Sequence, residues 1–228
     1  MNDGTINDLK AGWLGHVPSP LAKAFIDAGK LQTFPDGATV YGFGQEQCCL
    51  FGIASGHIRM WLTMNEQAPR FGHLAGPGFW FGEHEVVTGL PRIMEMEASG
   101  DTLLCMVARS EIDRIAKNHA EAWASVALLA VMNQGTAIGA ADDLMIRNAK
   151  KRLVAVLLRL SSHRNAYQGV SPISAVPVRQ TELADAATLS RSSALAILAE
   201  LSRDGLIRTD YRTIVILKPK QLGALLAD

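Results

Sequence analysis

The sequence predicts an α+β fold with an antiparallel β-barrel or sandwich, then a long helix, then a winged helix-turn-helix. Three observations predict it. Short stretches rich in β-branched and aromatic residues alternate with turn signals between Leu31 and Val107. A helical stretch follows, and a helix-turn-helix pattern with two strands closes the chain. We therefore expect three units, at residues 1–119, 120–147 and 148–228.

Length and composition fit a chain of two globular domains. At 228 residues it is long for one domain, and its 48% hydrophobic content is enough for a buried core. Every apolar run of about 18 residues is interrupted by charge or glycine, so we expect no membrane span or membrane partner. The N-terminus, Met1-Asn2-Asp3-Gly4, is neither basic nor apolar, which argues against a secretory signal. Only three cysteines fit a reducing compartment, so we expect a cytoplasmic protein.

Charge is divided unevenly along the chain, although the total is zero. Residues 1–146 hold nine Lys/Arg and sixteen Asp/Glu, a net charge of −7. Residues 147–228 hold thirteen and six, a net charge of +7. The pattern indicates that only the last third of the chain meets a polyanion.

The first unit is expected to begin with a short helix over residues 17–30, with Ser19 as its cap and Pro20 at its first position. Strands are expected at 38–41, 48–53, 57–62 and 102–107. The turn signals between them are Pro35-Asp36-Gly37, Ser55-Gly56, Gly76-Pro77-Gly78 and Ser99-Gly100-Asp101. Ser110 is expected to cap a helix that ends near Lys117.

The long helix has features of a dimer interface. Val131, Ile138 and Met145 fall seven residues apart and form an apolar stripe. Gly135 and Gly139 lie beside it, where they let two helix backbones approach closely. The alternative is one buried helix within a single chain. Asn148 is expected to cap a second helix, over 149–163, and to mark the domain boundary.

The basic third of the chain carries a helix-turn-helix pattern. A first helix is expected over 180–187, with Thr188-Leu189 as the turn and Ser190 as the cap of a second helix. In the second helix one stripe is apolar and the opposite face is small and polar, which suits the major groove of DNA. Two strands, 206–209 and 213–217, form a wing.

Within this pattern, Arg191 and Ser192 are expected to reach base edges, since they lie on the first turn of the second helix. Ser193 and Arg212 are expected to contact phosphates. The alternative is a three-helix scaffold that binds protein. The full set of candidate DNA-binding residues is Arg179, Gln180, Ser190, Arg191, Ser192, Ser193, Ala196 and Arg212.

Several ordered motifs then support a resemblance. In the basic third they are Glu182-Leu183-Ala184, Leu189-Ser190-Arg191 and Gly205-Leu206-Ile207; in the first unit they are Pro35-Asp36-Gly37, Gly44, Ser55-Gly56 and the run from Gly76 to Glu83, followed by Arg92. Together they resemble the CRP/FNR (cyclic-AMP receptor protein-like) superfamily over nearly the whole chain. The resemblance implies a β-roll effector domain (a double-stranded β-helix of the cyclic-nucleotide-binding type), a homodimer, and allosteric control of an inverted-repeat operator. RNA polymerase is a further candidate partner.

In this family the run from Gly76 to Arg92 corresponds to a phosphate-binding cassette, so the resemblance makes Glu83 the ribose-binding acid and Arg92 the phosphate-binding arginine. Glu85 and Ile93 depart from the pattern, which has small residues there. The Glu85 carboxylate beside Arg92 repels phosphate and shields the guanidinium. A second interpretation is that Glu83 and Arg92 form a structural ion pair. An ordinary cyclic nucleotide is thus disfavoured, and a cyclic-nucleotide-responsive regulator with an atypical cassette is the alternative. The candidate effector-pocket residues are Trp80, Gly82, Glu83, His84, Glu85, Arg92, Ile93 and Met94.

Other sensor chemistries are poorly supported. An iron–sulfur cluster typically needs four thiolates, and Cys48 and Cys49, as neighbours on a strand, point to opposite faces. We expect no metal site, and His84 is the only histidine considered as a haem or metal ligand. An apolar set that includes Met60, Phe79 and Met96 is more often core; as pocket walls it would suit an apolar or aromatic effector. A third interpretation is a sensor domain that binds nothing.

Enzymes are a competing class, but we find no G-x-S-x-G, H-E-x-x-H or phosphate-loop motif and expect no catalytic residues. A cyclic-nucleotide-binding regulatory subunit that acts on a protein partner is a second competitor. Such a subunit needs no basic helix-turn-helix, so the C-terminal third favours a DNA-binding regulator.

Overall fold

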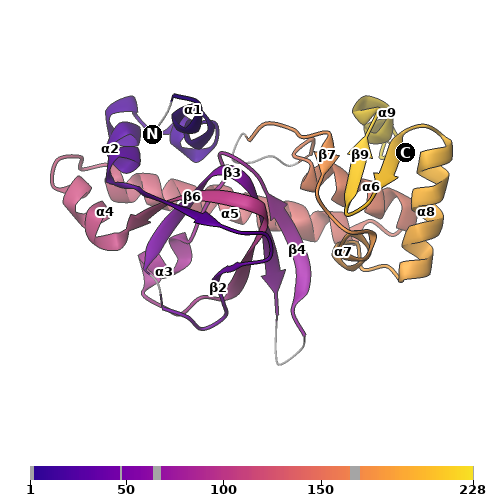
Figure 1. Ribbon diagram of the computed structural model, residues 1–228, viewed down its shortest axis with the longest axis horizontal. Coiled ribbons are helices and arrows are strands. Elements are labelled where there is room, and N and C mark those ends of the chain that lie inside the picture. Colours follow the sequence, from indigo (N-terminus) through magenta and orange to yellow (C-terminus); the bar gives the residue numbers. More distant parts are fainter. Residues whose placement is uncertain (1–2, 47, 64–67, 165–169, 228) are drawn as a thin grey trace.

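A long helix joins the two domains of the chain (Figure 1). The computed structural model describes residues 3–46, 48–63, 68–164 and 170–227. The N-terminal β-roll lies along helix α5 (Ala122–Met145), and the C-terminal domain follows where α5 ends. The α+β class, the β-roll and the helix-turn-helix that the sequence predicts are confirmed.

An antiparallel sheet folds into the β-roll, with strand order β1-β6-β3-β4; β2 also pairs with β6, and β5 with β3. Its strands are β1 (Lys30–Phe34), β2 (Thr39–Tyr41), β3 (Cys49–Leu62), β4 (Arg70–Ala75), β5 (Trp80–Phe81) and β6 (Met94–Ala108). Successive side chains on a strand point to opposite faces. One face therefore fills the interior of the roll, and the other packs against helices.

Two expected turns lie inside long strands, so the separate strands expected at 48–53 and 57–62 are one strand, β3. The expected turn at Ser99-Gly100-Asp101 likewise lies within β6. β3 and β6 pair along most of their length, with register shifts around Ser55. Gly56 has φ +77°, and a Cβ there would lie 2.6 Å from the Asp101 carbonyl. The glycines thus bend continuous strands at bulges rather than end them.

Helices cover the outer face of the roll: α1 (Asp3–Lys10), the 3-10 turn η1 (Trp13–His16), α2 (Ser19–Ala28) and α4 (Arg109–Ala116). Trp13 is fully buried between them and packs edge-on against Phe25 and Trp80, with ring centroids 5.2 and 5.4 Å apart. These contacts fix the N-terminal helices to the outer side of the roll.

The predicted helix caps at Ser19 and Ser110 are wrong, because both residues already lie inside their helices. Ala108 still pairs with Cys49 in the sheet, and the Arg109 N–H donates to the Cys48 carbonyl at 2.9 Å. Helix α4 therefore starts directly where β6 ends, without a capping side chain.

Helix α5 keeps part of its apolar surface exposed within one chain. Val131, Ile138 and Met145 are 62%, 58% and 80% exposed. Gly135 is half-buried, whereas Gly139 is buried against its own chain. By length and composition alone α5 is apolar enough to cross a membrane, a test that helices of soluble proteins also pass.

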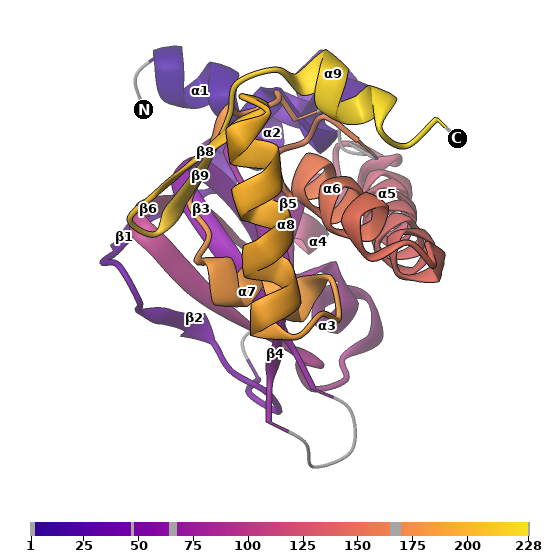
Figure 2. The ribbon, with the colours of Figure 1, turned by 90° about the vertical axis from the view of Figure 1, so that its right-hand side faces the viewer.

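The C-terminal domain contains α6 (Ala149–Leu160), β7 (Ala175–Val176), α7 (Gln180–Ala186), α8 (Arg191–Arg203), β8 (Ile207–Asp210), β9 (Thr213–Ile216) and α9 (Pro219–Ala224). The predicted cap of α6 is confirmed, since Asn148 Oδ1 accepts from the Lys151 N–H at 3.0 Å. Strand β7, which the sequence analysis missed, pairs with β9 beside the wing hairpin. Figure 1 shows α8 at the end of the domain that points away from the β-roll, and in Figure 2 this helix faces the viewer.

A buried arginine holds the two domains and α5 together. Arg159 of α6 donates from Nε to Asp143 Oδ2 of α5 at 2.8 Å, and both side chains are almost completely buried. Its Nη1 contacts two groups of β4, the Gly72 carbonyl at 3.3 Å and His73 Nδ1 at 2.9 Å. Arg164 Nε adds a second bond to Asp143, at 3.0 Å. We call Asp143, Arg159, Arg164 and His73 the junction cluster.

A second arginine joins the β-roll to the helix-turn-helix. Arg59 of β3 is buried, its Nε lies 3.3 Å from Glu182 Oε1 of α7, and its Nη2 donates to the Pro177 carbonyl at 3.4 Å. Phe71 and Leu74 of β4 belong to the same hydrophobic core as the C-terminal domain. The C-terminal domain is therefore packed onto the β-roll through both apolar and ionic contacts.

The junction cluster predicts a pH dependence of stability. Burial and the neighbouring Arg159 lower the pKa of His73 to about 3. Below its ordinary pKa of about 6.5 the unfolded chain takes up a proton that the folded chain does not, so stability falls as pH falls. His73→Gln, which still offers Arg159 an acceptor, should weaken this dependence by up to about 1.4 kcal/mol per pH unit. Urea unfolding at pH 7, 6 and 5 measures the free energy of unfolding of both proteins. An equal change of this free energy with pH in both proteins would contradict the prediction.

Candidate DNA-binding surface and effector cavity

Helix α8 presents one buried and one exposed face. Ser190 caps it as predicted, with its Oγ accepting from the Ser193 N–H at 3.1 Å. Ala194, Leu198 and Leu201 are buried in the domain core, and Ile197 is half-buried. The opposite face is exposed and carries Arg191, Ser192, Leu195, Ala196 and Ala199. This geometry allows an arginine and small side chains to enter a major groove.

The other candidate DNA-binding residues lie around α8. Arg179 is half exposed and precedes α7, and Gln180 is the first residue of that helix. The Arg179 N–H donates to Glu182 Oε2 at 2.6 Å, which fixes the start of α7. The Ser193 N–H is already used by the cap, and its hydroxyl oxygen accepts from Ser190 Oγ at 2.8 Å, so the Ser193 O–H is the donor left to meet a phosphate.

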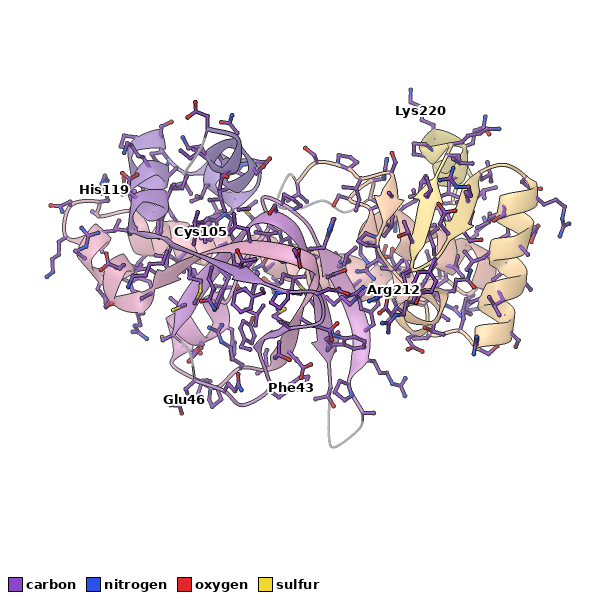
Figure 3. The ribbon with its side chains drawn as sticks, in the orientation of Figure 1. Phe43, Glu46, Cys105, His119, Arg212 and Lys220 are labelled. Atoms are coloured by element: carbon purple, nitrogen blue, oxygen red, sulfur yellow. The ribbon has the colours of Figure 1, made fainter. Side chains whose placement is uncertain are left out.

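Arg212 lies at the tip of the β8–β9 wing, on the side of the domain that faces the β-roll (Figure 3). Its Nη2 donates to Asp36 Oδ2 of the β-roll at 3.4 Å. Its backbone is left-handed, with φ +56°, and the preceding Tyr211 is 91% exposed. In this conformation the arginine predicted to contact phosphate is paired with a carboxylate of its own chain.

A cavity of about 140 Å³ lies between the β-roll and α5. Its wall is mainly apolar, formed by thioethers and aromatic rings of the roll and by small residues of α5. It also reaches Arg159 of the junction cluster. The lining residues are Tyr41, Met60, Leu62, Gly72, His73, Phe79, Phe81, Gly82, Glu83, His84, Arg92, Ile93, Met94, Met96, Asn133, Thr136, Ala137, Ala140 and Arg159.

Arg92 is held by other groups of the roll. Its Nε lies 2.6 Å from Glu85 Oε2, and both side chains are buried. Nη1 donates to the Gly82 carbonyl at 2.9 Å and Nη2 to the Cys49 carbonyl at 3.1 Å, while the guanidinium lies 4.2 Å above the centre of the Tyr41 ring. The partner of Arg92 is thus Glu85, and the interpretation of a Glu83–Arg92 structural pair is replaced. A phosphate would have to displace this carboxylate.

Gly82 permits this arrangement because it precedes helix α3 (Glu83–Thr88) with φ +97°. A Cβ there would lie 2.6 Å from the Cys49 carbonyl and 3.1 Å from Arg92 Nη1. Any larger residue would push the arginine out of its position.

Glu83 lines the cavity together with Arg92. Burial raises the pKa of the Glu83 carboxyl, and a hydrogen bond from Asn133 of α5 and the charge of Arg92 oppose that shift. His84 lines the same end of the cavity, and its Nε2 is buried without a hydrogen-bond partner among the described residues. In the described part of the chain no three His, Cys, Asp or Glu side chains gather to hold a metal ion.

Trp80 does not line the cavity, contrary to our expectation. It alternates with Phe79 and Phe81, which point inward, and packs on the outer side against Trp13. Its Nε1 donates to the Leu9 carbonyl at 3.0 Å. Glu85 also stays out of the cavity wall, and Ile93 lies at the rim, 58% exposed.

Sequence reasoning missed Tyr41, Asn133 and Thr136, which are single polar groups without a spacing motif. Arg159 did leave a signal. It is a lone charge between Leu158 and Leu160 in an otherwise apolar helix stripe, where a buried charge needs a partner.

Comparisons with known proteins agree with this architecture. Residues 31–119 match the model of the cyclic nucleotide-binding domain, and residues 151–225 match the Crp-like helix-turn-helix domain. The chain is 26% identical over 183 residues to the cyclic AMP receptor protein of Thermus thermophilus, covering 80% of this chain and 82% of that one.

Solved structures show the same fold. FixK2 from Bradyrhizobium japonicum superposes with a TM-score of 0.71 at 17% identity, over 86% of this chain and 96% of that one. A transcriptional regulator of the CRP family from Thermus thermophilus gives a TM-score of 0.68 at 24% identity, over 86% and 97%. The chain therefore belongs to the CRP/FNR superfamily of transcription regulators, with a β-roll of the cyclic nucleotide-binding type and a Crp-like DNA-binding domain.

Proposed function

We propose that this regulator is a cytoplasmic homodimer that binds an inverted-repeat operator and answers to an effector other than an ordinary cyclic nucleotide. The observation that carries the operator proposal is the exposed first turn of α8, which is capped by Ser190 and lies in a region of net charge +7. Two such helices about 34 Å apart fit successive major grooves. Phosphate neutralisation makes the binding fall steeply with salt.

The dimer proposal is supported by α5. Its exposed stripe of Val131, Ile138 and Met145 is apolar and has no cover within the chain among the described residues. Two copies of the helix cover each other when they pair in parallel. Gly135 lies beside the stripe at an accessible position, whereas Gly139 is buried, so Gly135 is the better candidate for close approach.

The effector proposal is supported by Arg92. Its ion pair with Glu85 and its hydrogen bonds to the Gly82 and Cys49 carbonyls occupy the guanidinium that a cyclic phosphate needs. A phosphate that takes the place of Glu85 leaves this buried carboxylate without its partner, and removing one partner of a buried pair costs about 3–5 kcal/mol. A cyclic nucleotide has to offset that cost before it binds at all.

Arg191→Ala should lower affinity for the operator by about 1–3 kcal/mol, because a bidentate contact to guanine is lost. Affinity for random duplex should change far less. The operator is first selected from a pool of random duplexes, and affinities are then measured by fluorescence anisotropy. Arg203→Ala, at the other end of the same helix, is the control for lost charge. Equal loss on both duplexes would make Arg191 a phosphate contact.

Ile138→Glu should convert the dimer to a monomer, since it places a charge in the middle of the apolar stripe. Sedimentation velocity at micromolar concentration measures the change, and Ile138→Leu, which keeps the stripe apolar, should stay dimeric. A wild-type monomer would overturn the dimer proposal.

Wild-type protein should give no cyclic AMP or cyclic GMP binding at micromolar concentration in titration calorimetry. Glu85→Ala combined with Ile93→Ser should create it, because the carboxylate on Arg92 and the bulk at the rim are both removed. Glu111→Ala, which removes an exposed glutamate paired with Arg114, is the matched control. Thermal melting establishes that the double variant is folded. Tight wild-type binding would contradict the effector proposal.

A further inference from the structure

Both arginines that line the cavity are already paired, which disfavours an anionic ligand. Each arginine has a buried carboxylate partner: Glu85 for Arg92 and Asp143 for Arg159. His73, also in the wall, is neutral because its pKa is about 3. An anion entering this space must displace a bonded carboxylate. A neutral molecule enters without such a loss.

One end of the cavity carries polar groups that can hold a ligand. Glu83 and His84 lie there side by side at the start of α3, and the buried His84 Nε2 has no hydrogen-bond partner among the described residues. An unmade hydrogen bond at a buried polar atom is costly, about 1–3 kcal/mol. The protein encloses that nitrogen, so the Glu83 carboxyl is the group at the start of α3 that a ligand hydroxyl or N–H can reach from the cavity.

The rest of the wall suits a flat apolar body. Met60, Met94 and Met96 supply thioethers, and Phe79 and Phe81 supply rings. Thioether sulfurs make favourable contacts with aromatic edges. The volume of about 140 Å³ is below the 300–1,000 Å³ of larger ligand sites. It is similar to that of an engineered apolar cavity of about 150 Å³ that binds benzene.

We propose that this cavity binds a neutral one-ring molecule with a single hydroxyl or N–H group. The ring lies among the methionines and phenylalanines, and its polar group donates to the Glu83 carboxyl. The statement that this molecule is the effector rests on the proposed function, in which the effector is not an ordinary cyclic nucleotide.

Arg159 in the cavity wall provides the route to the DNA-binding domain. Arg159 belongs to α6, lines the cavity and bonds to both Asp143 and β4. A ligand that fills the cavity contacts this arginine directly. A ligand in the cavity therefore acts on the position of α6, against which the helix-turn-helix packs.

The test uses full-length protein and three probes of similar shape: phenol, toluene and benzoate. Titration calorimetry should show phenol binding at least tenfold more tightly than toluene, which lacks the hydroxyl, and no binding of benzoate. Equal affinities for phenol and toluene, tighter binding of benzoate, or no binding of phenol would each overturn the proposal. This comparison needs no variant, so it holds even where a substitution unfolds the chain.

Two variants then locate the polar contact. Glu83→Gln should reduce phenol affinity about tenfold and leave toluene affinity unchanged, while Glu111→Gln on the surface should change neither. A loss of both affinities in folded Glu83→Gln would mean that the residue shapes the cavity rather than bonds to the ligand, and would overturn the assigned contact.

The regulatory part is measured separately, as operator affinity with and without saturating phenol. A shift in wild-type protein that is lost in folded Arg159→Lys, with both proteins saturated with phenol, supports the route through Arg159. An unchanged operator affinity on phenol binding overturns that route. Absence of operator binding in every condition overturns the proposed function instead, and leaves the calorimetric result standing.

Discussion

The bond between Asp143 and Arg159 is the contact on which the arrangement of this molecule depends. Asp143 is fully buried at the end of α5, and Arg159 is buried in the first helix of the C-terminal domain. Burying two charges is costly unless they are paired and hydrogen-bonded, and removing one partner of such a pair costs about 3–5 kcal/mol. Because the arginine also bonds to the Gly72 carbonyl and His73, one side chain fixes α5, α6 and β4 together.

The same chemistry closes the phosphate position of the β-roll. Arg92 and Glu85 are as deeply buried as the junction pair, and the arginine is completed by two carbonyls and the Tyr41 ring. The pair therefore gives rigidity where the family has an anion site. An exposed pair such as Arg208 with Asp210 contributes little by comparison, because water competes for both partners.

Patterns among residues close together in the sequence predicted much of the fold, whereas contacts between residues far apart in the sequence were not predicted. Asn148 and Ser190 are recognised as caps because the residues that they bond lie three positions along the chain. Gly56 and Gly100 were misread as turns, since a left-handed glycine looks the same in a hairpin as in a bulge of a long strand.

The candidate site follows the same rule. Most of the cassette residues do line the cavity, because their order along one short segment fixes their positions. Trp80 does not, because strand alternation turns it outward. The ion pair of Arg59 with Glu182 and the hydrogen bond between Arg159 and His73 join residues more than eighty positions apart. Nothing in local spacing indicates them.

The contacts between the domains differ in how easily DNA can replace them. Arg212 and Asp36 are both partly exposed and 3.4 Å apart, so exchanging that carboxylate for a phosphate loses little. Arg59 and Glu182 are both buried, so separating them breaks an ion pair that water screens little, although Arg59 keeps Glu97 and Glu182 keeps Arg179 as partners. The wing is therefore free to change partners on DNA, whereas α7 is held to the roll. Any rearrangement that moves α7 has to be driven from the β-roll, and the cavity beside Arg159 is where a ligand can supply that free energy.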